Sequence, residues 1–124
     1  MENIDMDNIL QSIKKMLGPS GNYEYFDTDL IIHINTVLFI LTQMGVGPAK
    51  GFSIKDGSET WENFVSDIEK LEAVKTYVYL KVKLIFDPPQ SSIVKSAIDE
   101  TIKELEFCLN VEADSNREEV DPNV

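Results

Sequence analysis

The sequence predicts an all-α protein, a small four-helix bundle with one inserted loop or short hairpin at about residues 49–65. Two observations carry this prediction. Apolar residues recur at three- and four-residue steps in four separate segments, which is the spacing of one face of a helix. The connections between these segments are short and carry glycine or proline, as in helix bundles. With 124 residues, 43% of them hydrophobic, the chain can build one helical domain, which we place at residues 1–113.

The first helix is expected over residues 4–17. Lys14 and Lys15 lie near its C-terminal end, where the helix dipole favours cations. Residues 18–21, Gly-Pro-Ser-Gly, end the helix and form a short loop. Its apolar face consists of Met6, Ile9, Leu10, Ile13, Met16 and Leu17.

The second helix is expected to begin with Asp27 or Thr28 as its N-cap and to run to Met44. Gly45 and the Gly47-Pro48 pair close it. Its apolar positions are Leu30, Ile31, Ile34, Val37, Leu38 and Leu41.

Residues 49–65 are the longest irregular stretch before the C-terminal tail. Apolar and polar residues alternate over residues 52–55, and Asp56-Gly57 follows as a hairpin-turn signal. We expect a short hairpin or an ordered loop here. One helical turn is expected next, carrying Trp61, Phe64 and Val65.

The third helix is long and ends abruptly at Pro88-Pro89. Ser66 and Glu69 have the spacing of a capping box at its start. Its first apolar stripe consists of Leu71, Val74, Val78, Val82 and Ile85, and a second stripe beside it consists of Tyr77, Leu80 and Leu84. A helix with two apolar stripes is either the buried centre of a bundle or a helix shared between the core and a neighbouring subunit.

A fourth helix is expected to begin at Ser91 or Ser92 and to run to about Val111, with one apolar stripe at Val94, Ile98, Ile102, Leu105 and Leu109. Residues 112–124 carry five acidic residues and one arginine, with little apolar content. This composition is typical of a disordered segment. We therefore expect residues 114–124 to form an acidic tail that is flexible unless it is bound.

The composition argues against several classes of protein. The net charge is −11, and a domain this acidic repels nucleic-acid phosphates. Solubility explains such acidity most simply, although a surface that avoids or mimics DNA is an alternative. No apolar run approaches the roughly 20 residues that span a bilayer, and the N-terminus lacks the features of a secretory signal. The single cysteine, Cys108, cannot form an internal disulfide, which fits a reducing compartment.

No residue pattern points to catalysis. His33 is the only histidine, and with Cys108 it falls short of the four ligands that a structural zinc site takes. An Asp29–His33 pair on one helix is more simply a partly exposed surface pair. Gly45, Gly47 and Gly51 lack the order and the lysine of a phosphate-binding loop. We predict no enzyme, no cofactor and no metal site.

Two groups of residues are candidates for a subunit interface. Apolar side chains in the irregular stretch either pin the loop to the core or, if the loop projects, anchor a partner. These are Phe52, Ile54, Trp61 and Phe64. Lysines on the long third helix either flank a surface or pair with a neighbouring subunit's acidic face. These are Lys75, Lys81 and Lys83.

Five segments together resemble the head–tail connector proteins, also called adaptor or head-completion proteins, of long-tailed bacteriophages and prophages. The resemblance covers most of residues 4–113. Its marks are FDTDLIIHIN at 26–35, QMGVGPAKGFSI at 43–54, the Trp61 segment, LEAVKTYVYLKVKLIFDPP at 71–89 and ELEFCLNV at 104–111.

This resemblance implies a structural virion protein that forms a homo-oligomeric ring, commonly a dodecamer, beneath the portal protein. The ring extends the DNA channel and offers the surface on which the tail docks through a tail-completion or tail-terminator protein. DNA passes through without specific binding, and no membrane is involved. The protein would be made in the bacterial host cytoplasm and reside at the head–tail junction of the virion. The alternative is a small acidic inhibitor that mimics DNA and blocks a host nucleic-acid enzyme.

Overall fold

Five α-helices account for most of residues 7–21 and 23–119, the part of the chain that this computed structural model describes. Short 3-10 turns, η1 (Gly18–Gly21) and η2 (Glu24–Phe26), join the first two helices. The described residues contain no strand, so the all-α prediction is confirmed. The helices are α2 (Ile9–Leu17), α3 (Asp27–Gln43), α4 (Trp61–Phe64), α5 (Ile68–Phe86) and α6 (Ser92–Glu119).

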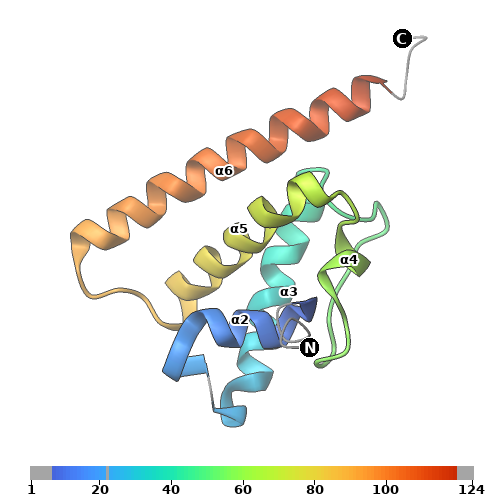
Figure 1. Ribbon diagram of the computed structural model, residues 1–124. Coiled ribbons are helices and arrows are strands. Elements are labelled where there is room, and N and C mark those ends of the chain that lie inside the picture. The colour runs from blue at the N-terminus through green and yellow to red at the C-terminus, as the bar shows by residue number, and fades with distance from the viewer. Residues whose placement is uncertain (1–6, 22, 120–124) are drawn as a thin grey trace.

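Helix α5 is the centre of the bundle. It packs against α2, α3 and α6, and Figure 1 shows it lying between α6 and the α2–α3 pair. Its buried side chains are Val74, Tyr77, Val78 and Val82, which come from both predicted stripes. Of the two interpretations of the double stripe, the structure supports the buried centre of a bundle.

Two helix starts differ from the prediction. Helix α2 begins at Ile9, because Asn8 has an extended backbone (φ −85°, ψ 132°) and its side chain accepts a hydrogen bond from the Gln11 amide at 3.0 Å. Residues 4–6 of the predicted helix lie outside the described residues. Helix α3 begins at Asp27 itself, so its N-cap is Phe26 rather than Asp27 or Thr28, and Phe26 provides no side-chain cap.

The capping box predicted at Ser66 and Glu69 is wrong. The N-cap of α5 is Asp67, whose carboxylate accepts a hydrogen bond from the Glu69 amide at 3.0 Å. A reciprocal capping box occurs instead before α4, where the Thr60 amide donates to Asn63 Oδ1 at 3.0 Å and the Asn63 amide donates to Thr60 Oγ1 at 3.3 Å.

Residues 45–65, which we call the clasp, form an ordered loop and the single turn of α4 rather than a hairpin. The Asn35 side chain on α3 pairs with the backbone of Ile54, donating to its carbonyl at 3.0 Å and accepting from its amide at 2.7 Å. The Ile9 amide donates to the Glu59 carbonyl at 3.0 Å. The buried Trp61 Nε1 donates to Ser12 Oγ on α2 at 2.8 Å. The clasp is therefore hydrogen-bonded to both α2 and α3.

Helix α6 lies along α5 and extends past the rest of the bundle (Figure 1). Ser91 Oγ accepts a hydrogen bond from the Val94 amide at 3.3 Å, as a helix cap does. Among its described side chains only Ile102 and Leu109 are buried. The helix continues to Glu119, so its predicted end near Val111 is wrong. The flexibility predicted for residues 114–124 stays a prediction, and residues 120–124 lie outside the described part of the chain.

By length and composition, the segment Glu24–Gln43 could cross a membrane. One side of this segment, however, forms part of the bundle core through Leu30, Ile34, Val37, Leu38 and Leu41. Core helices of globular proteins commonly have such a composition, and this segment is a core helix with a second, exposed apolar side.

Candidate functional site

The described residues contain no group of three or more His, Cys, Asp or Glu side chains that could hold a metal ion. His33 is partly buried on α3, and Cys108 is an exposed free thiol on α6. These two residues sit on helices that α5 separates (Figure 1), so the structure does not bring them together. The remaining candidates for a functional site are the surfaces of the bundle.

Three of the four apolar candidates from the irregular stretch are core residues. Ile54, Trp61 and Phe64 are at most 3% exposed. Phe52 is half-buried, and its ring centroid lies 5.4 Å from that of Phe64. These side chains hold the clasp on the core, which is one of the two interpretations drawn from the sequence, and the three buried ones offer almost no surface to a partner.

A depression of about 410 Å³ lies between the clasp and the start of α5. Residues 45–48 form one side of it, and Glu62, Asp67 and Lys70 contribute charged groups to its lining. Gly47 has φ +90°, and a Cβ atom at this position would lie 2.5 Å from the ring of Phe64. Only glycine therefore lets the loop approach the Phe64 ring so closely.

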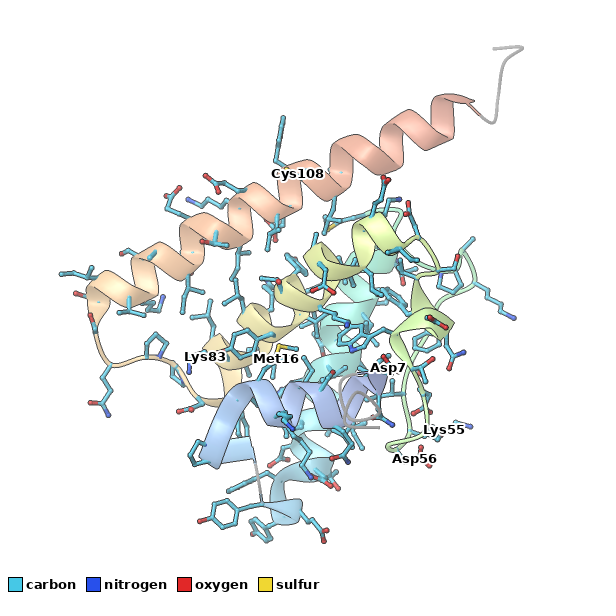
Figure 2. All side chains as sticks on the ribbon, viewed as in Figure 1. Asp7, Met16, Lys55, Asp56, Lys83 and Cys108 are labelled. Carbon is cyan, nitrogen blue, oxygen red and sulfur yellow. The ribbon has the colours of Figure 1, made fainter. Side chains whose placement is uncertain are left out.

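The three candidate lysines of α5 are partly buried and all interact within their own helix or its end. Lys75 Nζ lies 3.8 Å from Glu72, and Lys83 Nζ lies 3.9 Å from Asp87. Lys81 Nζ lies 5.9 Å from the centroid of the Tyr77 ring, within cation–π range. Figure 2 shows Lys83 near the C-terminal end of α5, close to the connection to α6. Their role between subunits stays a prediction.

Helix α3 carries an exposed apolar surface that the sequence analysis missed. We call Ile32, Thr36, Phe39 and Gln43 the α3 face. All four are exposed, and Ile32 and Phe39 are 56% and 61% exposed. Their steps of four, three and four residues place them on one side of the helix. The exposed Tyr25 lies just before the helix, in the η2 turn.

Helix α6 carries a second such surface. We call Ile93, Ala97, Glu100, Glu104 and Phe107 the α6 face. Ile93 is 80% exposed and Phe107 is 71% exposed. Helical periodicity places these residues on the side of α6 opposite Ile102 and Leu109, which are buried. The α6 face therefore points away from α5, and two carboxylates lie between its apolar ends.

A single polar contact ties α6 to the centre of the bundle among the described residues. The Tyr77 hydroxyl donates a hydrogen bond to Glu106 Oε2 at 2.8 Å. Burial of the phenol, reinforced by the hydrogen bond to Glu106 and by its negative charge, raises the pKa of Tyr77 well above its usual value. At neutral pH the hydroxyl is therefore protonated and acts as the donor.

An aromatic cluster lies where α3 begins and α5 ends. The ring of Phe26 makes edge-to-face contacts with Tyr25 and Phe86, at centroid distances of 5.2 and 5.4 Å. Tyr23 joins the cluster at 6.2 Å from Phe26. Because Tyr23 and Tyr25 are largely exposed, the cluster adds aromatic surface next to the α3 face.

Seven-residue spacing is the signal that could have identified both faces from the sequence. It joins Ile32 and Phe39 on α3, and it joins Ile93, Glu100 and Phe107 on α6. On α3 this signal is hidden because apolar residues occur on most sides of the helix.

The comparisons with known proteins give one result. The sequence model of a protein family described as "Phage connector protein" matches residues 9–116. The match begins at the start of α2 and ends within α6, so it includes the bundle and the clasp. The comparisons with curated proteins and with solved structures found no match.

Proposed function

The chain belongs to the phage connector protein family, and from this premise we propose that it is a structural subunit of the head–tail junction of a virion. In this proposal, copies of the chain form a ring, commonly a dodecamer, beneath the portal protein. The ring extends the DNA channel and offers the surface on which a tail-completion or tail-terminator protein docks. The observation that carries the proposal is the extent of the family match, which spans the whole bundle.

The surface of the bundle is consistent with a part in an assembly. Both the α3 face and the α6 face leave large apolar side chains in solvent, and aromatic and aliphatic groups of this kind anchor interfaces. We therefore propose a structural role for the chain within an assembly.

The acidity of the chain suits a ring through which DNA passes. With 22 acidic and 11 basic residues, the chain repels a phosphate backbone. The central helix α5 and the residues that cap it have no net charge, since residues 67–87 contain four acidic and four basic side chains. The excess negative charge therefore lies in the other segments, on surfaces that DNA would not adhere to.

Deletion of the gene from its phage or prophage tests this function. We expect electron microscopy of the induced lysate to show heads without tails, loss of packaged DNA and free tails alongside them. Expression of the intact chain from a plasmid should restore tailed particles. Intact virions in normal numbers after the deletion would overturn the connector role and favour the acidic inhibitor that mimics DNA.

The lysines of α5 give a second test. Changing Lys81 and Lys83 to Glu should leave the monomer folded, because both side chains reach the surface and neither forms part of the core. Ring formation should weaken, because the substitution removes two cations that would face an acidic neighbour. The matched control is Lys50→Glu with Lys55→Glu, which changes the net charge equally at exposed positions of the clasp. Circular dichroism reports folding, and sedimentation reports assembly.

Normal assembly of the α5 double variant would remove Lys81 and Lys83 from the interface. Equal loss of assembly in the control pair would assign the effect to total charge instead.

A further inference from the structure

The α3 face and the α6 face are apolar surfaces that no other part of the described chain covers. They lie on different sides of the fold, because α5 separates α3 from α6 (Figure 1). A protomer with two different apolar surfaces on different sides can associate head to tail. Such a contact closes into a ring when the rotation between successive copies allows it.

Charge decides which pairs of faces can meet. Residues 30–49 contain no Asp, Glu, Lys or Arg, so the four residues of the α3 face carry no formal charge, and the nearest acidic side chain on that side of the helix is Asp29, one turn before Ile32. The α6 face carries Glu100 and Glu104. Contact between two α6 faces would bring carboxylates of both copies together, and like charges across an interface are strongly unfavourable. Contact between an α6 face and an α3 face avoids this repulsion.

The α3 face also carries an uncharged donor. Gln43 at its C-terminal end offers an amide donor. The carboxylates of Glu100 and Glu104 are acceptors only. The α3 face therefore presents an amide donor next to apolar side chains, and the α6 face presents acceptors between apolar side chains.

We propose that the α6 face of one copy packs against the α3 face of the next copy, head to tail around the ring. The proposal rests on the proposed function for the existence of the ring, and it adds which surfaces of the chain build it. Phe107 then packs against Ile32 and Phe39 of the neighbouring copy. Ile93 lies beyond this contact, because it is about 21 Å from Phe107 along α6 whereas Ile32 and Phe39 are only about 10.5 Å apart along α3. Each copy contributes its α6 face to the contact with one neighbour and its α3 face to the contact with the other.

The only cysteine of the chain provides the test. Cys108 is exposed next to Phe107, and Figure 2 shows its place on α6. A second thiol is introduced on the α3 face by Thr36→Cys, or by Gln43→Cys if the first variant fails to restore tailed particles. The variant chain is expressed from a plasmid during induction of the deleted phage. Tailed particles are then purified and treated with a short bis-maleimide that joins two nearby thiols.

We expect a ladder of cross-linked species larger than dimers, because each copy would offer one thiol to each of its two neighbours. Adding Cys108→Ser to the α3-face variant should abolish the ladder. The matched control is Lys15→Cys, which puts an exposed thiol on α2, outside both faces as defined, and should give no ladder.

Tailed particles that give no ladder with either α3-face thiol would overturn the proposed contact and leave the connector function intact. A ladder of equal strength with Lys15→Cys would also overturn it. Cross-linked dimers that persist after Cys108→Ser would replace it with contact between two α3 faces. Failure of the function itself gives a different result, since tailed particles would then appear without any copy of the chain.

Discussion

The clasp and α6 both attach to the central bundle, but they attach in different ways. The clasp buries Ile54, Trp61 and Phe64 and makes side-chain or backbone hydrogen bonds to α2 and to α3. Helix α6 packs against α5 and buries only Ile102 and Leu109 among its described side chains. Length in residues is thus a poor guide to how firmly a segment is held. The short irregular segment is part of the core, and the longest helix is an addition to one side of it.

This contrast has consequences for stability and for motion. A segment with several buried side chains and hydrogen bonds to two helices opens only when most of the domain unfolds. A helix that is held through one neighbour and mainly exposed opens at a lower cost in free energy. We therefore expect α6 to be the part of the described bundle that adapts most readily to a partner.

The largest expected effect comes from removing the anchor of the clasp. Trp61 is 1% exposed, so Trp61→Ala should lower the free energy of unfolding by about 3–5 kcal/mol through lost burial and an unfilled cavity. The comparison variant is Phe107→Ala on α6, which removes an exposed ring and should cost less than about 0.5 kcal/mol. Urea denaturation followed by circular dichroism measures both. Similar losses in the two variants would contradict the contrast between clasp and α6.

An intermediate effect is expected at the glycines of the clasp. Gly47 and Gly51 have φ values of +90° and +97°, so alanine at either position costs about 1–2 kcal/mol in backbone strain. At Gly47 the new Cβ would also lie 2.5 Å from the Phe64 ring, whereas at Gly51 nothing lies within 4 Å. Gly47→Ala should therefore be more destabilising than Gly51→Ala, by about 1–3 kcal/mol. Equal thermal stabilities of the two variants would show that the Phe64 ring can move away from a side chain at position 47 at little cost in free energy.

The smallest expected effect concerns the attachment of α6. Tyr77→Phe removes the hydrogen bond to the Glu106 carboxylate and should cost about 1–2 kcal/mol. Because the pKa of Tyr77 is raised in the folded state, its contribution to stability is complete below about pH 10, the usual pKa of tyrosine, and is lost as the pH rises further. The advantage of the wild type over the variant should shrink by about 0.8 kcal/mol between about pH 8 and about pH 10.5.

Urea titrations of both proteins at the two pH values measure this change. The same difference between wild type and variant at both pH values would mean that Tyr77 ionises normally and is not held by Glu106.

The helices could be predicted from the sequence because their cause is local. The three- and four-residue periodicity identified α3 and α5, and the serines after Pro88-Pro89 identified the start of α6. The start of α2 could not be located in this way, because Asn8 is held extended partly by an isolated bridge to Thr60. That pairing joins residues far apart in the chain.

The same limit applies to the candidate interface residues. Whether Trp61 anchors a partner or the core depends on its hydrogen bond to Ser12, 49 residues earlier in the chain. Whether Ile54 projects depends on its pairing with Asn35, 19 residues earlier. Local patterns carry no information about such contacts. The exposed positions of α3 were missed for a related reason, since only the packing shows which side of an apolar helix is covered.

The position of the single tryptophan decides what an optical measurement on this protein reports. Trp61 is buried in the clasp and bonded to α2, and α6 contains no tryptophan. Indole fluorescence therefore reports the unfolding of the core and the clasp but not of α6. The far-ultraviolet circular dichroism signal comes from all helical peptide bonds, including those of α6. When α6 leaves the bundle and loses its helical structure before the core melts, the two signals separate. That separation, in ordinary melting curves, measures the independence of α6 without any label.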